Sequence, residues 1–239
     1  MSPNTIGLCM ELYNLLSSDI SAIFITLKLA LITCFFLAII GTPLAYYLAF
    51  ESKRSKSFLE AIVTLPLVLP PTVIGFYLIV FFSPDTSLGK FFIMLTGEQL
   101  IFSFYGLVLA SIIYSLPFWV QPLQSSFEKI GKDTIRTAYT LGASPLDTFK
   151  NIIIPLSKRG FLTSFIISFA HTMGEFGIVL MVGGGIHGKT KVIAISIYDH
   201  VEQLSFGKAH FLAAGMLILS FIILLSLFYS NRTRVVGIK

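Results

Sequence analysis

Two ionisable side chains, His171 and Glu175, lie four residues apart inside the apolar stretch FLTSFIISFAHTMGEFGIVLMV. Residues at this spacing share one face of a helix, so an imidazole and a carboxylate would lie next to each other. Such a pair could act as acid and base, or supply half of a metal site. Because no further His or Cys accompanies the pair, we expect no metal here. We favour a structural role in which Glu175 is hydrogen-bonded within a helix bundle.

Residues 183–190 read GGGIHGKT and satisfy the pattern G-x-x-x-x-G-K-T, which cradles phosphate groups in nucleotide-binding proteins. That role requires a strand before the loop and a soluble ATPase fold around it. The preceding segment is long enough to span a membrane, and no remaining soluble stretch could supply such a fold. We therefore interpret the motif as a glycine-rich exit from a helix, followed by a short external surface helix in VIAISIYDHVEQLSF.

The elements that hold these residues follow from the composition. Of 239 residues, 55% are hydrophobic and 12% are charged, which is too apolar for a soluble globular domain. A membrane helix needs about 20 apolar residues. Five stretches meet that length, at approximately residues 20–50, 58–82, 101–123, 161–182 and 209–230. The sequence therefore predicts an all-α membrane protein with five transmembrane helices, forming a single domain over residues 1–239.

Lysine and arginine side chains are distributed unevenly among the segments between these stretches. Twelve of the 17 lie in the first connecting loop, in the polar loop of residues 125–160 and in the C-terminal tail. Four lie in the second and fourth loops, none in the N-terminal segment, and Lys28 within the first stretch. Because basic residues accumulate in cytoplasmic loops, we expect the N-terminus outside the cell, and the C-terminus and polar loop in the cytoplasm. The net charge of +5 thus follows from topology and does not indicate nucleic-acid binding.

The second apolar stretch contains LPLVLPPT, in which Pro66, Pro70 and Pro71 must kink or unwind the helix. A broken helix leaves backbone groups that lipid cannot satisfy, so it is tolerated where it lines a cavity or packs against protein. Thr72, just beyond these prolines, is a hydroxyl placed to contact a ligand. The break is equally compatible with the lining of a translocation pathway and with a hinge that has no ligand role.

Other residues in the apolar stretches have positional interpretations. Lys28 lies near the outer end of the first stretch, where it either extends to the lipid headgroups or presents a positive charge to an anion pathway. Gly174, next to Glu175, would allow close packing or bending of its helix. Trp119 in the third stretch is interpreted as an anchor near the cytoplasmic interface.

The polar loop, residues 125–160, is the one long polar insert in the chain. In its first half Ile135, Ala138, Tyr139 and Gly142 follow the spacing of one helix face. Gly142 is a natural helix end. This half of the loop is therefore expected to form a short amphipathic helix.

Ser144 and Pro145 predict the start of a second short helix, with the serine as N-cap, the proline at the first helical position and Asp147 in the first turn. The apolar face of this helix would consist of Leu146, Phe149 and Ile153. Nothing in the sequence of the loop would bury the apolar faces of the two helices. We therefore expect the loop to dock on a partner.

The loop resembles the cytoplasmic signature loop of permease subunits of bacterial ABC importers, whose consensus is Glu-Ala-Ala, three residues, Gly, nine residues, Ile-x-Leu-Pro. The match includes Ala138, Gly142, Ile152 and Pro155, whereas Arg136, Thr137 and Ile154 depart from the consensus in a way that is typical of the oxyanion branch. In that family the loop forms a coupling helix that sits in a cleft of a separate ATPase subunit. The resemblance implies a coupling role for Arg136, Thr137, Ala138, Gly142, Ala143, Ser144, Pro145, Leu146, Asp147, Ile152 and Pro155.

The resemblance extends over nearly the whole chain and is strongest with the molybdate importers. It is carried by LPLVLPPTVIGFYL, TLGASPLDTFKNIIIPLS, SFAHTMGEFGIVLMVGG and GKTKVIAISIYDHVE. The family implies a type I ABC importer permease bundle in the bacterial plasma (inner) membrane, working by alternating access. Its implied partners are a second copy of the chain, two cytoplasmic ATPase subunits and an external molybdate-binding protein. ATP would be used by the ATPase, with no cofactor bound by this chain and no covalent chemistry performed by it.

Three alternatives stay open at this point. Sulfate and tungstate permeases share the coupling loop and a related Gly-Glu-Phe/Tyr-Gly segment, although they are less similar in the external stretch. A passive channel would conduct without ATP but would leave the amphipathic loop unexplained. A membrane enzyme would use His171 and Glu175 as acid and base, and would be active as a single polypeptide.

Overall fold

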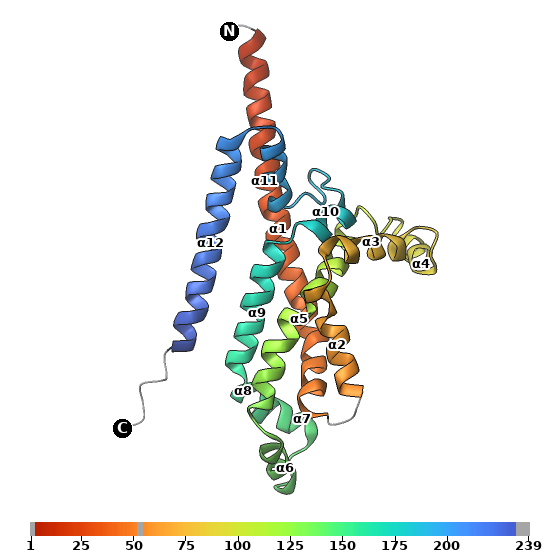
Figure 1. Ribbon diagram of the computed structural model, residues 1–239, viewed down its shortest axis with the longest axis vertical. Helices are drawn as coiled ribbons and strands as arrows, with labels where there is room; N and C mark the ends of the chain where they lie inside the picture. Colours follow the sequence, from red (N-terminus) through yellow and green to blue (C-terminus); the bar gives the residue numbers. More distant parts are fainter. Residues whose placement is uncertain (1–2, 52–54, 233–239) are drawn as a thin grey trace. The chain divides into compact units, whose positions relative to one another are not determined.

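The computed structural model describes residues 3–51 and 55–232, which form helices and loops with no strand among them (Figure 1). The helices are α1 (Pro3–Phe50), α2 (Ser55–Val68), α3 (Pro71–Phe82), α4 (Ser87–Thr96), α5 (Phe104–Glu128), α6 (Lys132–Thr140), α7 (Pro145–Thr148), the π-helix η1 (Phe149–Ile153), α8 (Ile154–Leu156), α9 (Lys158–Met173), α10 (Gly177–Gly183), α11 (Ile193–Glu202) and α12 (Phe206–Arg232). The all-α fold class is therefore confirmed.

The number of helices that can cross a membrane depends on how the broken ones are counted. By length and composition, three suffice alone, namely Asp19–Phe50, Phe104–Glu128 and Phe206–Tyr229. Two broken pairs, Lys56–Val68 with Pro71–Phe82 and Pro145–Leu156 with Lys158–Met173, raise the number to five. The five predicted spans agree with the upper count, and the orientation of the chain across the membrane stays a prediction.

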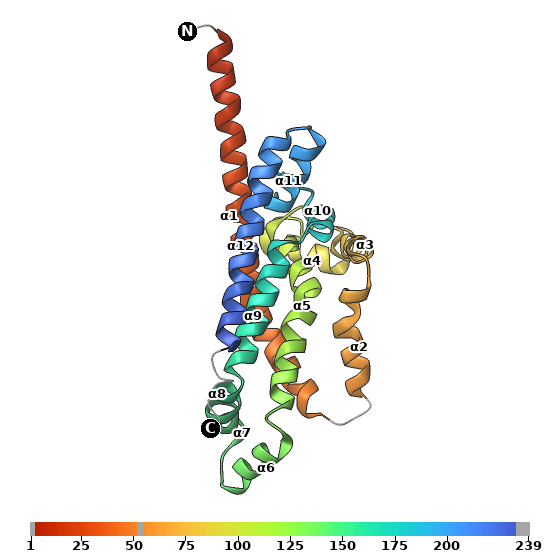
Figure 2. The ribbon, with the colours of Figure 1, turned by 60° about the vertical axis from the view of Figure 1, so that its left-hand side comes forward.

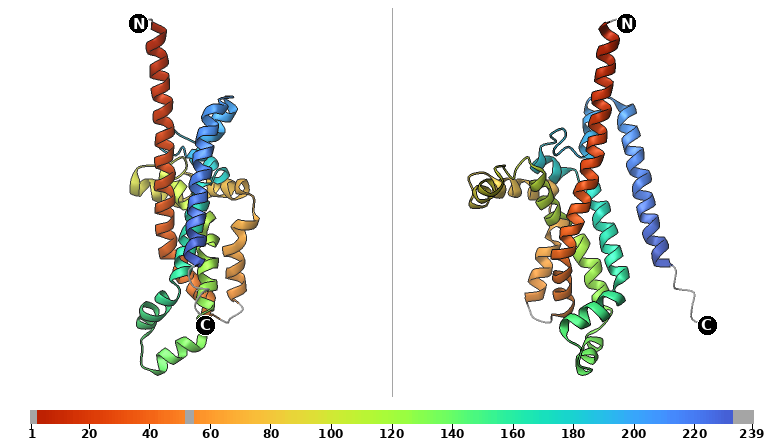
Figure 3. Two further views of the ribbon diagram at one scale, coloured as in Figure 1. Left: turned by 90° about the vertical axis from the view of Figure 1, so that its left-hand side faces the viewer. Right: turned by 180° about the vertical axis from the view of Figure 1, so that it is seen from behind.

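The second predicted span is broken where the prolines predict a break. Helix α2 ends at Val68, and α3 begins at Pro71 with Pro70 as its N-cap. Pro70 and Pro71 have no N–H to donate, so the α-helical hydrogen bonds to the carbonyls of Pro66 and Leu67 are lost at this point. In contrast, α1 remains helical through Pro43 (Figure 3).

The fourth predicted span, residues 161–182, is also broken. Helix α9 ends at Met173, and α10 begins only at Gly177. Gly174 is a poor helix former, and Phe176 has the non-helical angles φ −124° and ψ −64°. The break therefore falls beside Glu175, whose carboxylate bonds to another helix.

The described chain divides into two compact units, each assembled from three segments. Unit 1 comprises Met1–Thr33, Pro70–Ser111 and Thr172–Leu217, and unit 2 comprises Cys34–Leu69, Ile112–His171 and Ile218–Lys239. The prediction of a single permease domain stays untested.

Unit 1 is organised by the packing of α10 against α3. A Cβ atom on Gly75 would lie 3.0 Å from Met181 Sδ, and one on Gly177 would lie 3.0 Å from Pro71 Cβ. The absence of side chains at the two glycines therefore lets the helices approach closely. The predicted short helix after the glycine-rich loop is confirmed as α11, and its external location stays a prediction. Its first N–H, from Ile193, donates to Thr26 Oγ1 of α1 at 2.9 Å.

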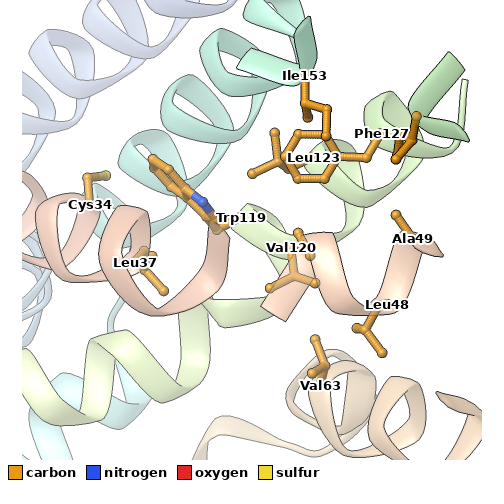
Figure 4. Close-up of a cluster of buried hydrophobic side chains, with 12 residues drawn as sticks. Cys34, Leu37, Leu48, Ala49, Val63, Trp119, Val120, Leu123, Phe127 and Ile153 are labelled. Atoms are coloured by element: carbon orange, nitrogen blue, oxygen red, sulfur yellow. The ribbon is translucent and has the colours of Figure 1, made fainter. Parts of the chain in front are cut away.

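Unit 2 has a core built around Trp119 of α5 (Figure 4). Trp119 is only 3% exposed, and its Nε1 donates to Thr42 Oγ1 at 3.3 Å. Gly41 makes room for the indole, because a Cβ atom there would lie 2.7 Å from Trp119 Cδ1. The interpretation of Trp119 as an interfacial anchor is therefore wrong. The core also contains Cys34, Leu37, Ala45, Leu48, Ala49, Val63, Val120, Leu123, Phe127, Ile135 and Ile153.

We expect Leu123→Ala to destabilise the protein measurably, because this side chain is fully buried in unit 2. Separated helices are surrounded by lipid and not by water, so the cost is mainly that of the cavity, about 1–2 kcal/mol. Unfolding in mixed micelles can be followed by the fluorescence of Trp119, the single tryptophan. The control is Leu225→Ala on α12, where the side chain is 54% exposed. Equal effects of the two substitutions would contradict the assigned core.

Candidate functional site

The polar loop folds as α6, a turn, and the short helices α7, η1 and α8 between α5 and α9 (Figure 2). Helix α6 ends at Thr140, and Gly142 adopts φ +87°, a left-handed conformation that favours glycine. The N–H of Ala143 donates to Ala138 O at 3.0 Å and closes the turn. The predicted end of the first helix at Gly142 is confirmed.

The start of the second helix also has the predicted cap. Ser144 Oγ accepts a hydrogen bond from the Asp147 N–H at 3.2 Å, and Pro145 occupies the first helical position. Asp147 in turn accepts a hydrogen bond from the Asn151 side chain. Backbone and side-chain bonds therefore fix the turn between the two halves of the loop.

Pro155 shapes the remainder of the loop. Because proline has no N–H and its ring crowds the carbonyl four residues earlier, Pro155 removes one α-helical hydrogen bond and distorts the helix before it. The chain forms the π-helix η1 instead, and the Ile154 N–H donates to Phe149 O, five residues earlier. Ile152 and Pro155 of the signature therefore lie in and directly after a widened helical turn.

The apolar face of the loop is divided between the core and the surface. Ile135, Ala138 and Ile153 are 8%, 5% and 0% exposed, and Ile135 and Ile153 belong to the core of unit 2. Leu141 and Leu146 are 83% and 62% exposed. The expectation that these faces need a partner outside the loop is met for Ile135 and Ile153 by the core of unit 2. Of the predicted face residues Leu146 stays exposed, as does Leu141, which was assigned to neither face.

The polar signature residues lie on the outside of α6. Arg136 and Asp133 form an exposed ion pair with an N–O distance of 3.5 Å. Thr137 donates to the Asp133 carbonyl at 2.9 Å. Exposed ion pairs of this kind contribute little to stability, so Arg136 is available to another protein at small cost.

Several predicted pathway residues gather in unit 1. Pro71 lies against Gly177, and Thr72 is exposed at the start of α3. Glu175 is 4% exposed and accepts a hydrogen bond from Ser111 Oγ at 2.5 Å, in agreement with the structural role favoured from the sequence. Pro70 and Gly174 are exposed at the two helix breaks, whereas Pro66 lies within α2 in unit 2.

Lys28 of α1 contacts an aromatic ring of α5. Its Nζ lies 4.7 Å from the centre of the Phe104 ring, a cation–π contact within unit 1. This contact holds the charge at the first turn of α5. The pathway roles of Lys28 and of the residues at the breaks stay predictions.

His171 lies in unit 2, at the end of α9. Its Nδ1 is 3.0 Å from Ser115 Oγ, and its ring stacks on Phe118 with 3.8 Å between centroids. Tyr114 lies 5.0 Å away in a tilted arrangement. The ring is therefore packed among aromatic side chains. In the part of the chain that the structure describes, no group of three His, Cys, Asp or Glu residues could hold a metal ion.

The GGGIHGKT loop is tied together by its own threonine. Thr190 is fully buried; its Oγ1 donates to Gly183 O at 2.5 Å and accepts from the Ile186 N–H at 2.9 Å. The loop follows α10 and not a strand. Its hydroxyl is thus occupied by the backbone, and the motif serves to turn the chain.

Helix α11 carries an ion pair and a histidine–carboxylate contact that the sequence did not reveal. Lys191 Nζ lies 2.5 Å from Asp199 Oδ2, and His200 Nε2 lies 3.1 Å from both carboxylate oxygens of Asp19 on α1. A hydrogen bond from Tyr198 to Glu202 raises the pKa of the tyrosine hydroxyl. These contacts fix α11 on unit 1.

The sequence also gave a signal for the partners of Glu175 and His171 that was missed. Ser111 and Ser115 are hydroxyls four residues apart in an apolar stretch, the same spacing as the ionisable pair. Each serine bonds to one member within its own unit. The equal spacing of the two polar pairs was a signal for these bonds, although Glu175 lies beyond the end of α9.

Comparison with known proteins identifies relatives over nearly the whole chain. The family model described as "binding-protein-dependent transport system inner membrane component" matches residues 41–234. The molybdenum transport system permease protein ModB of Azotobacter vinelandii is 50% identical, over 90% of this chain and 95% of that protein. A protein described as a probable sulfate transport system permease of Prototheca wickerhamii is 30% identical, over 87% and 83%.

The fold itself matches a solved transporter. A crystal structure of a bacterial ABC transporter involved in the import of the acidic polysaccharide alginate contains a chain that superposes with a TM-score of 0.68. The match covers 91% of this chain and 80% of the other, with 17% sequence identity. At this identity the similarity establishes the fold alone.

Proposed function

This chain belongs to the family of binding-protein-dependent transport system inner membrane components, and on that premise we propose that it is the permease subunit of an ATP-driven importer that carries molybdate across the bacterial plasma membrane. The observation that carries the proposal is the identity with the Azotobacter molybdenum permease, which extends over nearly the full length of both chains. A sulfate or tungstate permease is the alternative within the same family, supported by the more distant sulfate relative.

The proposed assembly contains a second copy of this chain, two cytoplasmic ATPase subunits and an external molybdate-binding protein. The ATPase subunits would use ATP, and this chain would bind no cofactor and catalyse no covalent step. The relatives are transport permeases, which supports this division of roles. A membrane enzyme based on His171 and Glu175 is disfavoured, because each side chain is engaged by a serine of α5.

The polar loop is the proposed contact with the ATPase. Leu141 and Leu146 project into solvent from the turn and from α7, while neighbouring residues anchor the loop in the core of unit 2. An anchored loop with exposed leucines can fill an apolar cleft without losing its own fold. Closure of the ATPase dimer would pull on this loop, and the broken helices would accommodate the resulting change between inward and outward states.

The first test is uptake of radiolabelled molybdate into proteoliposomes that contain the permease, its ATPase and its binding protein. We expect uptake that requires ATP and all three components and that resists excess sulfate. If excess sulfate abolishes molybdate uptake, the importer mechanism stands and sulfate becomes the proposed substrate. Competition by tungstate is tested in the same way. Absence of ATP-dependent uptake for every oxyanion would contradict the importer and favour a channel or an enzyme.

The second test concerns the exposed leucines. Leu146→Asp should lower ATP-dependent uptake at least about tenfold, because a buried unpaired carboxylate costs several kcal/mol at an interface. Leu146→Met retains an apolar side chain and should preserve most of the uptake. Ala138→Asp is unsuitable, because Ala138 is buried and the charge would disturb the loop itself. Normal uptake by Leu146→Asp would exclude docking through this residue.

The third test concerns orientation. In a variant without Cys9 and Cys34, Thr140→Cys on α6 should react with a membrane-impermeant maleimide only from the cytoplasmic side. Gln203→Cys, at the end of α11, should react only from outside. Both positions are exposed, so accessibility depends on the side of the membrane alone. Labelling of Thr140→Cys from outside would reverse the proposed topology.

A further inference from the structure

A pocket of about 780 Å³ opens in unit 2 between the end of α5 and the start of α9. This volume lies within the range of about 300–1,000 Å³ that is typical of small-molecule sites. Its polar lining consists of two cations, Lys129 and Arg159, and three hydroxyls, from Ser125, Ser126 and Thr163. None of the described side chains that line it is acidic.

The pocket has a fixed wall because α5 and α9 approach closely at Gly160. A Cβ atom on Gly160 would lie only 2.4 Å from Ser126 Cβ, so no larger residue fits at this contact. Beside this contact the apolar side chains of Pro122, Ile130 and Leu156 complete the lining. The site thus combines a cationic, hydroxyl-rich part with an apolar part.

The two cations have no carboxylate partner to neutralise them. The residues that the structure describes place no Asp or Glu oxygen within 4.0 Å of Lys129 or Arg159. The nearest carboxylate in sequence, that of Glu128, is bonded to Lys56 at 3.3 Å and to Gln124 at 3.1 Å. Two unpaired cations on one pocket attract an anion, and a guanidinium group matches the geometry of a phosphate or similar oxyanion.

We propose that this pocket binds a tetrahedral oxyanion group, with Arg159 and Lys129 as the cationic donors and the three hydroxyls as neutral donors. The same chemistry is offered by the phosphate of an anionic phospholipid and by a free oxyanion. The apolar wall and the predicted cytoplasmic end of the helices suit a lipid, since basic pockets between helices at this level bind anionic headgroups. Binding of a lipid at this pocket does not depend on the proposed transport function. Binding of a molybdate ion there would rest on that function.

The lipid arm uses the full-length permease in detergent and measures phosphatidylglycerol binding by native mass spectrometry, with diacylglycerol as the lipid that lacks phosphate. The double variant Lys129→Ala/Arg159→Ala should weaken phosphatidylglycerol binding at least about tenfold. The matched control Lys132→Ala/Lys158→Ala removes the same charge at exposed positions outside the pocket and should change binding less than about twofold. Thermal unfolding of each variant checks that it is folded. If the double variant does not fold, Arg159→Lys provides the test, with an expected loss of about threefold.

The free-ion arm measures binding of radiolabelled phosphate and molybdate to the delipidated permease by equilibrium dialysis. Binding of either ion that is lost in the double variant and retained in the control identifies a free oxyanion as the ligand. Binding of phosphatidylglycerol with the same dependence identifies the lipid. The proposal is overturned if neither probe binds, or if the pocket variants and the control variant bind alike. Phosphate and lipid binding can fail while molybdate uptake succeeds, so failure of this site is distinguishable from failure of the proposed function.

Discussion

Breaks in apolar helices free backbone N–H and C=O groups, and a chain of this composition must satisfy those groups without relying on water. Unit 1 does so with a hydroxyl and backbone partners where α10 ends. Thr190 bonds to both Gly183 O and the Ile186 N–H after α10, and the Phe102 N–H donates to Val182 O at 2.8 Å. These bonds fix the loops that follow the broken helix. They also give the residues of the phosphate-loop pattern a role in turning the chain.

Unit 2 holds the polar loop by packing part of it in a core and leaves another part exposed for the proposed contact with the ATPase. The core around Trp119 extends into the loop through Ile135 and Ile153. Leu141 and Leu146 stay in solvent. Since packed interiors transmit displacement and do not absorb it, a force on the exposed leucines would reach the helices of unit 2 through this core. The buried isoleucines would thus connect the exposed leucines mechanically to the helices of unit 2.

Local signals were sufficient for the turns and caps, and insufficient for burial. The glycine at 142, the Ser144 cap and the Pro70 break follow from the conformational limits of single residues, so the sequence predicts them correctly. The burial of Ala138 and Trp119 depends on which helices pack together, and periodicity identifies a face without identifying its neighbour. The cationic pocket was missed for the same reason, because its lining comes from the two ends of the polar loop, and charge counting assigned its lysine and arginine only to a side of the membrane. The coupling and pathway roles rest on resemblance and remain predictions.

The chain connects the two units in two ways, through continuous helices and through a break between helices. Helices α1, α5, α9 and α12 each contain a boundary between the units, and α9 ends two residues beyond its boundary, whereas the chain passes from Leu69 to Pro70 between α2 and α3. There the Leu69 N–H bonds back to Leu65 O, and the N–H groups of Val73 and Ile74 bond to Pro70 O. No backbone hydrogen bond among these joins the two sides, because neither proline can donate one. A rotation at this point would therefore cost fewer backbone bonds than bending any of the unbroken helices. If transport requires the units to change their relation, the Pro70–Pro71 step is one connection at which that change breaks few backbone bonds, and the break between Met173 and Gly177 is another.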